Sequence, residues 1–126
     1  MIRQAFPPAL LAVLGFAAPC WAHHSMAMFD RSRSLTLQGT VRQYQWTNPH
    51  CFIQLLVPSG EGTVEWSIEM NSPGASFREG FRPGTLKAGD KVTVIINPVR
   101  DGTHGGRLVS AADAAGRSLN GAGPAQ

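Results

Sequence analysis

The residues best suited to chemistry lie at His23-His24-Ser25, where the sequence changes character. Directly before them, Ala22 ends a segment with the pattern of a secretory signal peptide. Cleavage after Ala22 would leave a free α-amine and two imidazoles within two residues. An N-terminal histidine can chelate a metal through its α-amine and one ring nitrogen, and a further imidazole gives a nitrogen set that favours Cu(II). The sequence therefore predicts a copper site anchored by His23, with His24 as a further ligand.

The export signal has three recognisable parts. Arg3 stands in a short positive region, residues 5–18 are apolar, and small residues occupy the positions one and three before the cleavage point. The apolar run is shorter than the roughly 20 residues of a membrane helix, and it contains two prolines. We therefore predict removal of residues 1–22, a periplasmic location, and no stable membrane insertion of the mature chain.

The roughly 100 residues that remain are enough for one small domain with a single core. We assign this domain to residues 23–119 and a flexible tail to residues 120–126. Of the 11 basic residues only Arg3 is lost with the signal, whereas all 8 acidic ones remain, so the mature net charge is mildly positive. Such a charge argues against nucleic acid as a partner.

Cys51 is the one thiol of the mature chain, because Cys20 leaves with the signal. An intramolecular disulfide is thereby excluded. In an oxidising compartment an exposed thiol is a liability, so we expect Cys51 to be a buried, small apolar residue. Metal ligation and an intermolecular bridge are the alternatives.

The mature chain has mainly the period-two patterning of β-strands. Ser72-Pro73 is an N-cap followed by proline, which predicts a helix start. The dense apolar run at residues 51–57 indicates a strand that is buried on both faces. Strands are predicted at residues 34–46, with a bulge near 42–45, and at 51–57, 63–70, 92–96 and 108–111, the last extended by 117–119; one short helix is predicted over 73–79.

This order of elements predicts an all-β fold, a small five-stranded OB-like barrel, with a small β-sandwich or β-roll as the alternative. In an OB barrel the loops after the first and fourth strands flank one binding face. His50 and His104 fall in these two loops, so we expect them to converge as further metal ligands. Residues 27–35 could span roughly 30 Å if extended, which allows the N-terminal histidines to join them. Met26 and Met28 add thioethers suited to Cu(I), and zinc is the alternative metal.

Catalysis has little support in the sequence. There is no Gly-x-Ser-x-Gly, no phosphate loop and no Cys-x-x-Cys-His, so we expect no enzymatic activity. Glu69 is predicted to orient a ligand histidine, against the alternative that it is merely exposed with Glu65. Tyr44, Trp46, Phe52 and Trp66 could form a stacking platform, but packing is the favoured interpretation.

Several short motifs occur together: His23-His24-Ser25 with Phe29-Asp30, residues 37–41, Trp46-Thr47-Asn48-Pro49-His50, Trp66 with Glu69, residues 86–92 and residues 98–102. In these motifs the chain resembles, over residues 23–119, a family of small exported bacterial proteins known as a domain of unknown function. The resemblance implies export and a compact β fold, without an established activity or cofactor. It emphasises His23, His24, Asn48, His50, Trp66 and Glu69, whereas His104 lies in a looser stretch and Cys51 stands at an aliphatic position. By architecture alone, the chain is also distantly similar to an exported bacterial OB-fold family linked to stress responses.

Two functional hypotheses follow. The first is a non-enzymatic periplasmic metal-binding module, for copper, with His23 as the anchor ligand. The second is an OB-like interaction module that binds a periplasmic protein or an envelope ligand, without metal, through the loop face around Trp46, Asn48 and His50. A copper-dependent oxidase is a third and weaker hypothesis.

Overall fold

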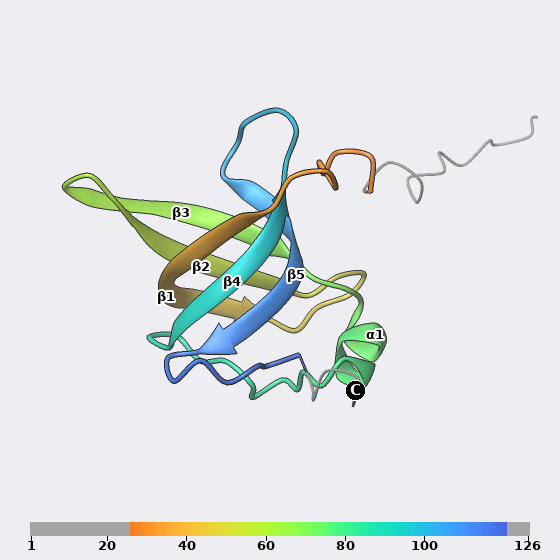
Figure 1. Cartoon of the computed structure of the whole chain (residues 1–126). Helices are drawn as coiled ribbons and strands as arrows, with labels where there is room; N and C mark the ends of the chain where they lie inside the picture. The colour runs from red at the N-terminus through yellow and green to blue at the C-terminus, as the bar shows by residue number, and fades with distance from the viewer. Residues whose placement is uncertain (1–25, 121–126) are drawn as a thin grey trace, which may run out of the picture.

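Five strands and one short helix make up the domain in the computed structural model, which describes residues 26–120 (Figure 1). The strands close into a barrel in the order β1-β2-β3-β5-β4, with α1 between β3 and β4. All pairings are antiparallel except β3 with β5. This is the OB-type barrel predicted from the sequence. The elements are β1 (Leu35–Gln45), β2 (Phe52–Ser59), β3 (Gly62–Glu69), α1 (Pro73–Arg78), β4 (Lys91–Pro98) and β5 (Gly105–Asp113).

Three predictions concern residues outside the described range. The signal peptide, the His23-His24 pair, and residues 121–126 of the proposed tail all lie there. Within the described range, no helix is long and apolar enough to cross a membrane.

Strand β1 bends so that it can pair on both sides of the barrel. Its register with β2 shifts between Val41 and Gln43, which confirms the predicted bulge. Its first half pairs with β4 and its second half with β2. Gly39 permits the close approach, because an added Cβ would meet the carbonyl oxygen of Leu56 and come within 2.9 Å of Leu55 Cγ. A barrel of five strands requires this sharp coiling.

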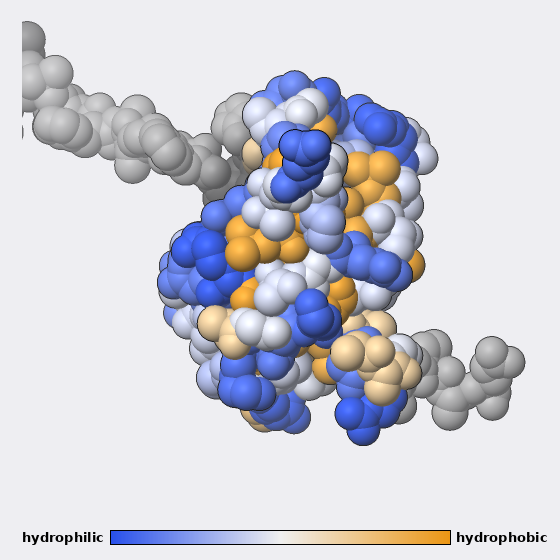
Figure 2. Space-filling model, turned by 90° about the vertical axis from the view of Figure 1, so that its left-hand side faces the viewer, coloured by the Kyte–Doolittle hydropathy of each residue, from blue (hydrophilic) through white to orange (hydrophobic). Residues whose placement is uncertain are grey.

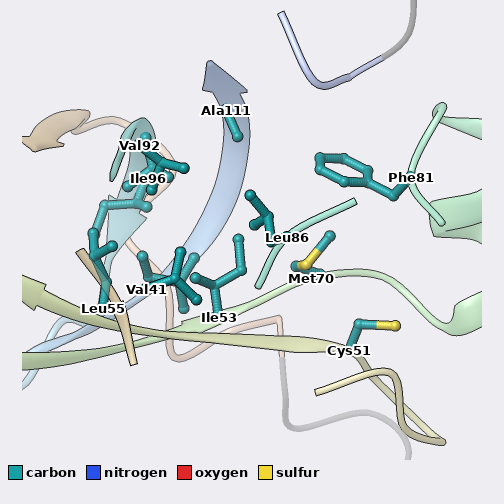
Figure 3. Packing of buried hydrophobic residues seen from close by; sticks show 12 residues of the cluster. Val41, Cys51, Ile53, Leu55, Met70, Phe81, Leu86, Val92, Ile96 and Ala111 are labelled. Atoms are coloured by element: carbon teal, nitrogen blue, oxygen red, sulfur yellow. The ribbon is translucent and has the colours of Figure 1, made fainter. Parts of the chain in front are cut away.

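The core fills the barrel and its helix-capped end (Figure 3). Cys51 is buried in it, as predicted, and Met70 is buried beside it in the same cluster. Ser72 caps α1 by accepting a hydrogen bond from the backbone of Ala75, and Phe81, shortly after the helix, packs into the cluster. The fully buried cluster comprises Val41, Cys51, Ile53, Leu55, Ile68, Met70, Phe81, Leu86, Val92, Val94, Ile96 and Ala111.

The prediction that residues 51–57 are buried on both faces was wrong. Ile53 and Leu55 point into the barrel, whereas Phe52, Gln54 and Leu56 on the alternate face are only half-buried. A closed barrel has one interior, and within residues 26–120 no second sheet lies over the outer face of β2. Figure 2 accordingly shows hydrophobic areas among hydrophilic ones on the side where the β2–β3 hairpin projects.

The C-terminal part differs from the predicted outline at both ends of the fifth strand. The loop between the strands predicted at 92–96 and 108–111 is shorter than expected, since Pro98 belongs to β4 and Gly105 begins β5. The segment 117–119 does not extend β5 but folds back on it, with Ser118 bridged to Ala112. Asn120, expected in the flexible tail, accepts a hydrogen bond from the backbone of Ala111 at 2.7 Å. Local patterning did not reveal this reversal because it depends on a turn.

Candidate functional site

The first described residues are bound to the β4–β5 loop. Phe29 is buried and forms an isolated β-bridge with Val99. The Arg100 backbone donates to the carbonyl oxygen of Met28 at 2.8 Å, and its guanidinium lies 3.6 Å from the Asp30 carboxylate. The N-terminal segment is therefore held against the loop that carries His104 (Figure 1).

A surface hollow of about 210 Å³ lies where this segment meets the sheet. Met28 lines it from the N-terminal segment, and His104 lines it from the end of the β4–β5 loop. Phe52 of β2 and Ser67 and Glu69 of β3 line it from the sheet. The hollow is thus bordered by a methionine, a histidine and a glutamate from three parts of the chain.

Glu69 also contacts the second loop histidine. Its Oε1 lies 2.8 Å from Nδ1 of His50 and 3.3 Å from a guanidinium nitrogen of Arg107. The Glu69 and Arg107 side chains are only 12% and 14% exposed, and that of His50 is 30% exposed. Both interactions are therefore shielded from water far more than a surface ion pair.

Arg107 is connected to more than Glu69. It donates to the carbonyl oxygen of Met70 at 2.9 Å and to the side chain of Asn71, which in turn donates to Glu79 at the end of α1. Met70 and Asn71 belong to the segment that leaves β3 and enters the helix. Arg107 consequently fixes the end of β3, where the Glu69 carboxylate is displayed.

His104 is positioned differently. Its ring packs against Trp66 with centroids 5.0 Å apart and planes inclined by 53°. Its carbonyl oxygen accepts a hydrogen bond from the backbone of Ser67 at 3.1 Å. The imidazole is exposed, whereas Trp66 is half-buried and packs against the core. Trp66 thus serves as a support for His104.

The aromatic residues of the first loop region are mainly packing residues. Trp46 lies edge-to-face with Tyr44 at 6.1 Å, and both pack against the core. The Tyr44 hydroxyl donates to the carbonyl oxygen of Arg82, and burial raises the pKa of Tyr44. Asn48 is exposed, and Thr47 donates to the carbonyl oxygen of His50 at 2.7 Å. Packing was the favoured interpretation of Trp46 and Tyr44, and it is confirmed.

The predicted site residues therefore meet in part. Glu69 touches His50 and lines the same hollow as His104, while the exposed Glu65 pairs with Arg42 instead. Over residues 26–120, no three histidine, cysteine, aspartate or glutamate residues form a group that could hold a metal. His23 and His24 lie outside this range, so the four-histidine site stays a prediction.

Sequence reasoning missed Arg107. A single basic residue after two glycines carries no recognisable signal, and its partner Glu69 lies 38 positions earlier. The contacts of Arg100 with Met28 and Asp30 were not predicted either, although residues 98–102 were recognised as a motif.

Comparisons with known proteins place the chain in a family without assigning an activity. No curated protein and no solved structure matches it. One family model matches residues 11–109, which is most of the sequence and includes β1 to β4 and the first half of β5. The chain therefore belongs to the family of unknown function DUF6152.

Proposed function

We propose that this protein is a non-enzymatic copper-binding module of the periplasm, anchored by His23 at the mature N-terminus. The observation that supports it best is the position of Met28, which lines the same hollow as His104 and Glu69. Four peptide units connect His24 to Met28, so their Cα atoms are at most about 14 Å apart. His24 is thus within reach of the hollow that His104 lines.

The donor atoms around the hollow suit copper in both oxidation states. An α-amine and imidazoles favour Cu(II), which has the highest affinity in the divalent series, and a thioether favours Cu(I). His104 is an exposed imidazole, and the exposed Met28 supplies the thioether. His50 does not line the hollow but contacts Glu69, which does, and is the additional imidazole of the proposal. Zinc would use the imidazoles but gain little from the thioether.

The test is a Cu(II) titration of the exported protein after mass spectrometry has established its N-terminus. Adding Gly-Ser-Gly before His23 keeps every imidazole and removes the α-amine from the chelate ring, so we expect at least a tenfold loss of affinity (about 1.4 kcal/mol). His104→Ala should weaken binding as well. Unchanged affinity in the extended protein would refute the anchor role of His23.

A matched control separates the proposal from binding by a flexible tail. A synthetic peptide of residues 23–30 carries the same amine, histidines and methionines without the barrel. The intact protein should bind Cu(II) more tightly than this peptide, because His104 and His50 are added. Equal affinities would exclude a role for the barrel.

The metal-free interaction module predicts the opposite pattern. In that case the exposed Asn48 in the β1–β2 loop would matter, and His23 would not. Pull-down of periplasmic proteins by the intact chain, by Asn48→Ala and by His23→Ala distinguishes the two proposals. Retention of a partner by His23→Ala and its loss in Asn48→Ala, together with absent copper binding, would favour the interaction module.

A further inference from the structure

We infer that Arg107 is a positioning residue that acts through Glu69 to hold His50 as the Nδ1–H tautomer, which makes Nε2 the ligand atom of this imidazole. The identity of the ligand, copper, rests on the proposed function. The tautomer and the role of Arg107 rest on contacts within the barrel.

His50 and Arg107 share one carboxylate oxygen of Glu69. Glu69 Oε1 lies 2.8 Å from His50 Nδ1 and 3.3 Å from Arg107 Nη1. An ionised carboxylate can only accept hydrogen bonds, so the ring nitrogen beside it must carry a proton. In a neutral imidazole the lone pair is then on Nε2.

The guanidinium of Arg107 also holds the Glu69 carboxylate. Arginine stays charged in proteins and only donates hydrogen bonds, so it can hold an acceptor in place. Arg107 is largely buried and is bonded to Glu69, to the carbonyl oxygen of Met70 and to Asn71. It therefore fixes the position of the Glu69 carboxylate.

Strand β3 carries a second glutamate that pairs with an arginine. Glu65 lies four residues before Glu69 on the same face and pairs with Arg42 at 2.7 Å, with both side chains more than 40% exposed. Within residues 26–120, no histidine forms a hydrogen bond or an ion pair with either member of that pair. It offers a matched acid–arginine pair that lacks the proposed positioning role.

A carboxylate on the distal nitrogen is the usual support of a metal-bound histidine. It fixes the tautomer and ring orientation, and its removal weakens metal binding by about 10–100-fold. Applied to this chain, the triad His50, Glu69 and Arg107 would present Nε2 in a fixed direction before any metal arrives. This pre-organisation reduces the ordering cost of binding.

The decisive experiment is imidazole ¹⁵N NMR of the metal-free protein at a pH where His50 is neutral, with assignment by His50→Gln. Wild type should show a protonated Nδ1 and an unprotonated Nε2. The double variant Glu69→Met with Arg107→Met replaces the pair by apolar side chains of similar length and should shift His50 to a tautomer mixture. The matched double variant Glu65→Met with Arg42→Met should leave the His50 signals unchanged.

The single variants test Arg107 itself. Arg107→Met should move the His50 signals part of the way toward the mixture, whereas Arg107→Lys should restore the wild-type pattern. A protonated Nε2 in wild type would overturn the tautomer assignment. Wild-type His50 signals in a folded Arg107→Met protein would overturn the positioning role of Arg107. If this variant does not fold, wild-type His50 signals in the double variant Glu69→Met with Arg107→Met would overturn it.

A copper titration then connects the inference to the proposed function. We expect Glu69→Met with Arg107→Met to bind Cu(II) about tenfold more weakly than the matched control. Because the tautomer is measured without metal, the failure of copper binding would leave that result intact. Copper binding that is unaffected by loss of the tautomer would instead remove His50 from the ligand set.

Discussion

The two histidine loops of the barrel are held by different forces. His50 follows β1 and is tied by an ion-pair network to Glu69 and Arg107. His104 precedes β5 and rests on the ring of Trp66, while its loop is bound to the N-terminal segment through Arg100. A carboxylate determines which nitrogen of an imidazole points outward, whereas an aromatic ring restrains only the plane. The difference predicts a rigid imidazole on one loop and an adaptable one on the other.

Removing Arg107 should have the largest effect, because it breaks the network on the His50 side. Arg107→Met leaves the Glu69 carboxylate shielded from water without its positively charged partner. Removing one member of such a buried pair costs about 3 kcal/mol of unfolding free energy. Arg42→Met, which breaks the exposed pair with Glu65, should cost less than about 1 kcal/mol. Urea denaturation monitored by tryptophan fluorescence measures both. Equal losses of unfolding free energy would mean that the Glu69–Arg107 pair contributes no more to stability than the exposed Glu65–Arg42 pair.

Replacing Trp66 should have an intermediate effect and act on the His104 side. Trp66→Leu keeps an apolar side chain against the core but loses part of the packing, which we expect to cost about 2 kcal/mol. His104→Ala should cost only about 0.5 kcal/mol, because the imidazole is exposed and loses a single ring contact. Thermal unfolding followed by circular dichroism measures both. A larger cost for His104→Ala than for Trp66→Leu would show that the histidine supports the tryptophan rather than the reverse.

The smallest effect concerns the pH dependence of the β4–β5 loop. The backbone amide and hydroxyl of Thr103 donate to Asp101, and these bonds lower the pKa of Asp101 below its ordinary value of 3.8. With a lowered pKa in the folded state, the stabilisation is complete above the ordinary pKa and is lost as the pH falls through the lowered one. Asp101→Asn should therefore reduce the loss of stability between about pH 6 and about pH 3. Identical pH profiles for the variant and wild type would contradict this role of Asp101.

Much of the barrel was predictable because its information is local. The alternation in β1, its bulge near Val41 and the capped start of α1 depend on neighbouring residues. The burial of Cys51 followed from composition and position. The outer face of β2 was mispredicted, since an apolar run cannot reveal whether a second layer covers the strand.

The candidate site divides along the same line. The sequence by itself determined which residues could bind a metal, the type of fold, and the two loops in which His50 and His104 stand. Only the tertiary structure decided that Glu69 touches His50, that Arg107 holds Glu69 from 38 residues away, and that Met28 shares a hollow with His104. The physical reason is that these contacts depend on the parallel pairing of β3 with β5, whose register places Glu69 opposite Arg107. No local sequence pattern encodes this pairing.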